Sequence, residues 1–374
     1  MKIIEDIAVS LDYKHKITYI HVIEVMTKNR LITLIISLLV TNMLFAQTAG
    51  TNTLKPASDS GYLQSYSNYI NTSLSYGTYN MQFRLSDASG LKFIFSPNEI
   101  YQTKIGVAYS FIDVAYAFSS KILTINNSTD KKGTTTRNDL AFVFRLNRFY
   151  LKLERSDDKG FYLLNTKDFY EDWKPGDPYF QFPDLRVIQT GGSLTYNCNR
   201  RFSVSGLVSG TEHQLKTAYT FLPTIYTYFF KITDEDTSVS KGKDEYTRNT
   251  DISIGLPAAA SFVFAKNCYF AVSAGPSIGV NFVSSTLIDD DLQKVKQKQS
   301  VVSFGYSARV SAGWSNQKFF AGIDGNYRKY SHNEDDNTLF QKRFYDANIY
   351  VGMRFPPPGF VKHSIDWVKK VLPL

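Results

Sequence analysis

The sequence has little of the residue types that define several protein classes. It contains 2 cysteines and 5 histidines in 374 residues. Cys198 and Cys268 are far apart, and neither belongs to a CxxC pair, so zinc-site and redox-motif interpretations fail on spacing. Both fall at expected short turns, where they are either paired in a disulfide or left as free thiols. We expect no metal and no cofactor.

Long hydrophobic runs are also missing beyond the first 46 residues. No later segment approaches the roughly 20 consecutive apolar residues that one helical membrane crossing requires. The net charge of +8 is modest and its Lys and Arg residues are spread along the chain. Without a concentrated basic stretch to follow a phosphate backbone, we expect no nucleic-acid partner.

Aromatic residues are abundant. They make up 15% of the chain, with 28 Phe and 25 Tyr against 3 Trp, yet the mean hydropathy is slightly negative. A transmembrane β-barrel has this composition because only alternate side chains face lipid.

The N-terminal region has the pattern of an export signal. From Met26 the chain reads MTKNRLITLIISLLVTNMLFAQTAG, in which Lys28 and Arg30 precede an apolar run that ends at the small residue Ala46. This arrangement predicts a secretory signal peptide, and the alternative is an uncleaved anchor helix. The expected parts are an upstream extension preceding the true start at residues 1–25, the signal peptide at 26–46 and a periplasmic linker at 47–69.

Beyond the linker, apolar and polar residues alternate with a period of two, as in strands with two different faces. The clearest case is 345–355, where Tyr345, Ile349 and Val351 share one face and Asp346 and Asn348 the other. The expected strands are approximately 70–84, 100–110, 112–123, 137–146, 148–157, 185–197, 201–212, 249–265, 268–285, 300–314, 317–330 and 340–355.

The connections between these segments alternate between short turns and long polar loops. Outer-membrane barrels have tight periplasmic turns and long outer loops, whereas a soluble sandwich has no reason to sort its loops by end. The sequence therefore predicts an all-β fold, a transmembrane antiparallel up-and-down barrel over 70–355. We expect about 12 strands, within a range of 10–14, with both termini periplasmic and long extracellular loops.

Charged residues on the opposite face of these strands are candidates for lining the lumen. They carry both signs and are Lys104, Asp113, Arg145, Lys152, Glu154, Asp251, Arg309, Asp324, Arg328, Asp346 and Arg354. Two interpretations remain open. The charges either pair across a hydrated or plugged interior, or they select small solutes that pass through it.

Other chemistry has weaker support. Acidic clusters at 234–236, 289–291 and 333–336 suit Ca²⁺, but they fit no EF-hand loop and equally suit solvated loops bridged to lipopolysaccharide by cations. Ser209 and His213 are a candidate pair for lipid hydrolysis, although no nucleophile motif surrounds them. We therefore favour no catalytic role.

The chain continues beyond its last strand. Tyr350, Gly352 and the terminal aromatic Phe355 resemble the recognition signal that the barrel-assembly machinery reads. A proline run then ends the strand, and residues 356–374 are expected to form this break and a short amphipathic helix, or else a frayed tail.

Four segments in order, LKFIFSPN (91–98), KIGVAY (104–109), FPDLR (182–186) and GMRF (352–355), resemble an uncharacterised domain-of-unknown-function family of Bacteroidota outer-membrane barrels. The resemblance implies membership, location and barrel architecture, and it carries no activity.

These observations predict a protein of the bacterial outer membrane, delivered there by signal-peptide-directed export. Its expected role is structural or that of a porin-like channel for small solutes. The alternatives are a lipid-modifying outer-membrane enzyme and a soluble exported β protein that binds a partner. The expected partners are membrane lipid, lipopolysaccharide, the barrel-assembly machinery and a small solute.

Overall fold

A computed structural model describes most of the chain after residue 57. The described ranges are 58–59, 61–86, 91–98, 100–120, 128–207, 210–235, 246–265, 267–288, 294–334 and 338–371. The expected upstream extension and signal peptide lie outside them, as does Ser209.

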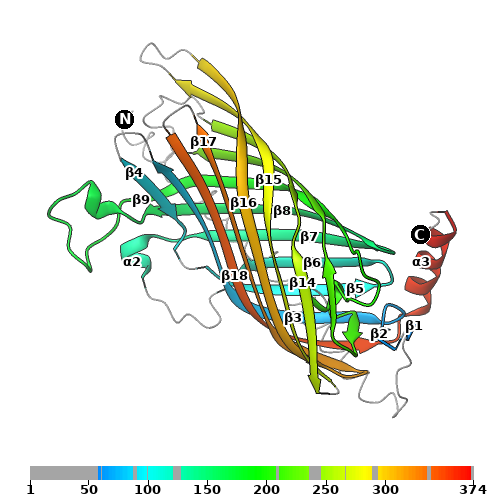
Figure 1. The fold of residues 1–374 in the computed structure, drawn as a ribbon. Helices are drawn as coiled ribbons and strands as arrows, with labels where there is room; N and C mark the ends of the chain where they lie inside the picture. Colours follow the sequence, from blue (N-terminus) through cyan, green and yellow to red (C-terminus); the bar gives the residue numbers. More distant parts are fainter. Residues whose placement is uncertain are drawn as a thin grey trace, which may run out of the picture. The chain divides into compact units, whose positions relative to one another are not determined.

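The described strands form one closed antiparallel barrel (Figure 1). Its wall contains β3 (Ile70–Ser86), β5 (Ile100–Tyr109), β6 (Ile112–Ser119), β7 (Thr136–Leu146), β8 (Phe149–Leu163), β9 (Gln181–Tyr196), β11 (Ala218–Phe221), β12 (Thr224–Asp234), β13 (Tyr246–Gly255), β14 (Ala258–Ala265), β15 (Cys268–Ile288), β16 (Lys294–Ser315), β17 (Phe319–Glu334) and β18 (Thr338–Phe355). Pairing of β18 with β3 and of β15 with β16 closes the ring.

Two wall strands are each broken by a proline. Pro223 separates β11 from β12, and Pro257 separates β13 from β14. Proline cannot donate to the ladder, so each strand is interrupted there and then resumes. Counted as continuous strands, these pairs give the described barrel the expected twelve.

The outer face of the wall is an apolar belt. Outward residues such as Ile349 and Phe304 are 66% and 62% exposed. The belt ends sharply: Tyr327 pairs with Tyr345, and two residues further along the same ladder Lys329 pairs with Arg343. An apolar band with an aromatic border is the surface that a transmembrane barrel presents to lipid.

The seventh expected strand was placed wrongly. Residues 201–207 and 210–212 are not in the wall, and the strand that follows β9 is β11 and β12 (218–234). The expected short turn at 197–201 is therefore the start of a 21-residue connection, and the expected loop at 212–249 begins only at 235. Alternation in 201–207 resembles a strand, whereas Pro223 weakens the pattern of the true one.

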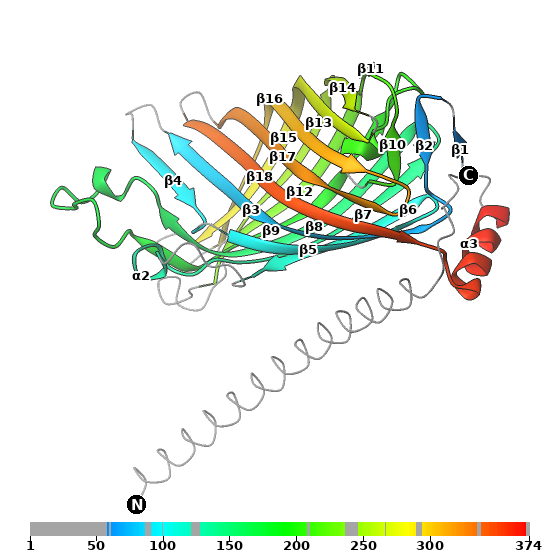
Figure 2. The same ribbon diagram turned by 90° about the horizontal axis from the view of Figure 1, so that it is seen from below.

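We call the end where β3 begins and β18 ends the turn end. There, residues 197–207 and 210–217 fold inward with β1 (Ser58–Asp59) and β2 (Leu63–Ser65), and together they form what we name the floor. It contains η2 (Ser205–Leu207) and β10 (Glu212–Gln214), which pairs with β2 (Figure 2). Phe202, Val204 and Leu207 pack on the inward side chains of Tyr269 and Ala271. The interior is filled at this end.

At the opposite, loop end an apolar cluster fills the interior. Its members, which we name the ceiling, come from five strands and are Tyr79, Met81, Phe83, Phe161, Val187, Tyr228, Phe230, Phe340 and Phe344. All are at most 7% exposed. They sit at inward positions, where burial of their rings removes apolar surface from water.

Two of the segments that carry the family resemblance, 91–98 and 182–186, have packing roles at the loop end. Residues 92–96 form β4 (Lys92–Ser96), which pairs with both β3 and β8 and so bridges them beyond the shorter strands between. The ring of Phe95 meets Phe182 edge-on with centroids 5.3 Å apart. Asn98 donates to the carbonyl oxygen of Gly133, just after α2 (Thr129–Lys132), at 2.8 Å. The long connection after β8 contains η1 (Thr166–Asp168).

After the prolines, α3 (Gly359–Val371) extends the chain beyond the turn end (Figure 2). Its Phe360 and Trp367 are exposed, and Lys369 and Lys370 lie in its last turn. None of the helices in the described ranges is long and apolar enough to cross a membrane.

Candidate functional site

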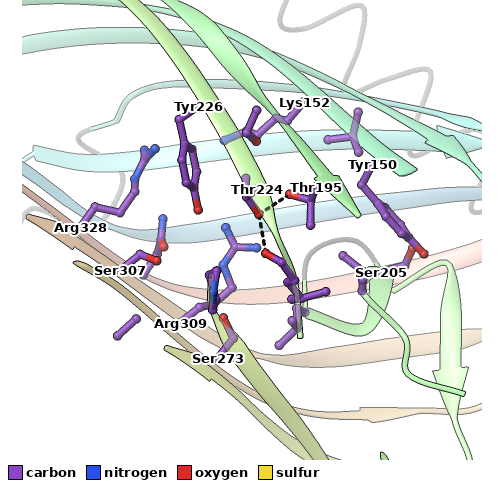
Figure 3. Close-up of a pocket in the computed structure, with 18 of the residues that line it drawn as sticks. Tyr150, Lys152, Thr195, Ser205, Thr224, Tyr226, Ser273, Ser307, Arg309 and Arg328 are labelled. Carbon is purple, nitrogen blue, oxygen red and sulfur yellow. Dashed lines mark hydrogen bonds between the residues drawn. The ribbon is translucent and has the colours of Figure 1, made fainter. Parts of the chain in front are cut away.

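A polar chamber lies between the floor and the ceiling. It consists of two cavities of about 150 and 190 Å³ that share lining residues such as Lys152, Arg309 and Arg328. Figure 3 shows these three side chains around the smaller cavity, on different strands of the wall, with Ser205 of the floor at the right. Floor and ceiling residues line both cavities, so the chamber lies inside the barrel.

The chamber exists because one part of the wall carries small inward side chains. Along β3, β5, β6 and β7 the lining residues include Ser73, Ser75, Gly106, Ala108, Ala115, Ala117 and Ala141. A Cβ added to Gly106 would lie 2.5 Å from the Oγ of Ser73. The inward side chains of this part of the wall are therefore already closely packed, and the free space of the chamber lies on their inner side.

Most chamber charges belong to ion pairs. The guanidinium of Arg137 donates from Nη1 to both carboxylate oxygens of Asp158 at 2.8 Å and from Nη2 to Asp139 at 2.5 Å. It also lies over the ring of Tyr79, 3.5 Å from its centroid. Arg145 similarly pairs with Asp113. In a low-dielectric interior, pairing offsets much of the desolvation cost of such charges.

A second network surrounds Glu154. Its carboxylate accepts from Lys152 and from the hydroxyl of Tyr228, the latter at 2.6 Å, and lies 3.9 Å from Arg328. Arg328 in turn donates to the Tyr228 hydroxyl at 3.0 Å. This network joins the chamber to the ceiling.

Arg354 ties the wall to the floor. Its side chain is 1% exposed and lies between the rings of Tyr66 and Phe320. It donates to Asn71 at 3.0 Å and to the carbonyl oxygen of Gly210 in the floor. Arg354 thus joins the end of β18, the start of β3 and the floor.

The eleven predicted charged residues all lie on the inner side of the wall. Those around the chamber are Lys104, Asp113, Arg145, Lys152, Glu154, Arg309, Asp324, Arg328 and Asp346. Asp251 pairs with Lys342 beside the ceiling, and Arg354 contacts the floor. Sequence reasoning missed Arg137 and Lys342, although inward alternation within β7 and β18 would have included both.

The three residues proposed as an assembly signal have different surroundings. Tyr350 lies inside the barrel, where its hydroxyl is 2.7 Å from that of Tyr269. A Cβ on Gly352 would overlap the ring of Phe320, so glycine keeps that ring in place against Arg354. Phe355 ends β18.

Of the candidate pair for lipid hydrolysis, Ser209 lies outside the described residues. His213 is in the floor strand β10 and is 4% exposed. Burial, with the charge of Arg354, lowers the pKa of His213 to about 4. Burial raises the pKa of its neighbour Glu212, whose carboxylate accepts from the Ser203 hydroxyl at 2.7 Å. A neutral, buried imidazole fits a structural role in the floor.

The described residues contain no cluster of three or more His, Cys, Asp or Glu side chains with metal-ligand geometry. The acidic clusters at 289–291 and 333–336 fall wholly or partly outside them. Cys198, exposed in the floor segment, and Cys268, at the start of β15, are free thiols.

A closed twelve-stranded antiparallel barrel with an apolar outer belt and a charged interior is a transmembrane β-barrel. Residues 57–355 match a family model described as "Domain of unknown function (DUF4421)". The chain belongs to that family, and the match coincides with the floor strands and the barrel.

No curated protein matches the chain. Among solved structures it is similar to the outer membrane protease OmpT from Escherichia coli, with 8% identity, a TM-score of 0.36 and coverage of 78% of this chain and 98% of that one. It is also similar to the COG4313 outer membrane channel from Pseudomonas putida F1, with 9% identity, a TM-score of 0.33 and coverage of 80% and 100%. At such scores the barrel assignment depends on strand order and the apolar belt described above.

Proposed function

We propose that this protein is an outer-membrane barrel that admits a small polar solute to an internal chamber and is closed at both ends at rest. The observation that carries the proposal is the charged chamber between floor and ceiling. A purely structural barrel needs no polar cavity, because buried charges cost free energy unless they are compensated. A solute that enters must displace the floor, the ceiling or both.

The apolar belt and the lengths of the connections support a proposed location and orientation. Backbone N–H and C=O groups in lipid must form their hydrogen bonds within the protein, and a closed barrel meets this requirement. Barrels of this kind reside in outer membranes. We propose that residues 26–46 direct export and that the turn end faces the periplasm. The exposed aliphatic belt argues against the alternative of a soluble exported protein.

Assembly and surface contacts complete the proposal. We assign the terminal aromatic Phe355 to recognition by the barrel-assembly machinery, since Tyr350 and Gly352 have internal packing roles.

At the loop end Arg186 binds Asp157 and Glu235, and Lys159 binds Asp184 and Glu235, on the outer side of the wall. This charged rim lies beyond the apolar belt, at the level where lipopolysaccharide headgroups are met.

Swelling of proteoliposomes tests passage. Wild-type protein should admit glycine slowly and exclude raffinose. Arg354→Ala weakens the floor and Phe83→Ala with Phe340→Ala weakens the ceiling. Because the two obstructions are in series, the combined variant should swell much faster than either alone. Heat-modifiable gel migration verifies folding, and a folded combined variant that remains impermeant to glycine would reject passage.

A further inference from the structure

The charges of the larger cavity divide into paired and unpaired groups. Six of its charged lining residues belong to the ion pairs described above. The other four have no ion-pair partner among the described residues and are Lys104, Arg309, Asp324 and Asp346. They comprise two cations and two carboxylates, so the unpaired set has no net charge but carries both signs.

These four residues occupy one continuous arc of wall. Their strands, β16, β17, β18 and β5, are neighbours, with only β3 between the last two. Arg309 lies at one side of the arc and Lys104 at the other, with the carboxylates between. Both cations are close enough to act electrostatically on Asp324.

The two carboxylates are held side by side by amides. The Nδ2 of Asn348 donates to Asp324 at 3.2 Å and to Asp346 at 3.1 Å, and Asn326 donates to Asp346 at 3.2 Å. Asn348 is 4% exposed and its own Oδ1 has no partner. The carboxylates are therefore fixed in position without being neutralised.

We propose that this arc binds a small zwitterion of the α-amino acid class. Its ammonium group would lie against Asp324 and Asp346, and its carboxylate against Lys104 or Arg309. A simple anion would meet two carboxylates and a simple cation two positive side chains, so neither compensates the whole arc. The cavity of about 190 Å³ is small, and the Gly, Ala and Ser wall facing it leaves room for a short side chain.

The proposal deepens the function proposed above, but binding and passage are measured separately. Isothermal titration of the full-length barrel in detergent should show binding of L-alanine. N-acetyl-L-alanine lacks the ammonium and L-alaninamide lacks the carboxylate, so each should bind at least tenfold more weakly.

Side-chain variants should then assign each end of the ligand. Lys104→Gln with Arg309→Gln should weaken the binding of alanine at least tenfold and leave the binding of alaninamide unchanged. Asp324→Asn should weaken the binding of alanine and leave the binding of N-acetyl-alanine unchanged. Arg155→Gln, an exposed outward position, should leave all affinities unchanged.

To ensure that the closed floor does not hide the site, the titrations are repeated with Arg354→Lys, which loosens the floor. Absence of alanine binding in both proteins, or equal binding of all three probes, overturns the zwitterion proposal. Alanine binding without swelling of the opened proteoliposomes overturns passage alone.

Discussion

Arg354, the penultimate residue of β18, donates a hydrogen bond from Nη2 to the carbonyl oxygen of Gly210 in the floor. One side chain thus connects the last strand of the wall with a segment 144 positions away in sequence. The contact lies where the barrel closes, because β18 pairs there with β3. Closure of the wall and placement of the floor are therefore coupled.

Arg354→Lys should loosen the floor while the barrel still forms. Lysine keeps the charge but lacks the fork that reaches Asn71 and Gly210 together. Loss of hydrogen bonds to a buried charged group should lower the free energy of unfolding by about 3 kcal/mol. The loosening would be measured as a lower temperature at which the heat-modifiable gel shift occurs and as faster proteolysis within 197–217. Arg343→Lys, on the outer side of the same strand, should change neither.

Ile349→Arg should destabilise the barrel in lipid. Ile349 is 66% exposed and pairs with Ile323 at the centre of the outward belt. An arginine at the bilayer midplane costs about 2–4 kcal/mol, whereas beyond the aromatic border the cost approaches zero. Denaturant unfolding in liposomes measures it, with Ser331→Arg as the matched control. Equal stability of the two variants would place the belt outside the hydrocarbon.

Acid should loosen the floor through His213. Folded His213 takes up a proton near pH 4, whereas the unfolded residue does so near its ordinary pKa of 6.5. The contribution of neutral His213 to the free energy of unfolding is therefore complete above pH 6.5 and is lost as the pH falls toward 4. Glu212, with its raised pKa, opposes this trend, since its protonation on acidification favours burial.

Proteolysis of the floor at pH 7.5 and 4.5 isolates the histidine. His213→Gln should show a smaller increase in cleavage on acidification than wild type does, and His363→Gln in α3 should behave as wild type. An identical pH response in all three proteins would exclude His213 as the titrating group.

The wall was predictable because its cause is local. A strand between lipid and lumen must alternate, so Ile349 and Asp346 were assigned to opposite faces from sequence alone. The same pattern placed all eleven charged candidates inward. The prediction of a wall strand at 201–212 was wrong for a related reason. Residues of the floor also alternate, because their two faces have different surroundings. Pro223 weakens the alternation of the true strand that follows.

The sequence by itself determined the barrel and, for the strands that it placed correctly, which side chains face lipid, since both follow from a period of two. Only the tertiary structure decided that the floor residues 197–207 and 210–217 fold inward, that Arg137 and Glu154 are neutralised, and that Lys104, Arg309, Asp324 and Asp346 are not. The partners of Glu154 include Tyr228 and Arg328, which come from strands far apart along the chain, and no local pattern encodes which inward charges meet inside a closed ring.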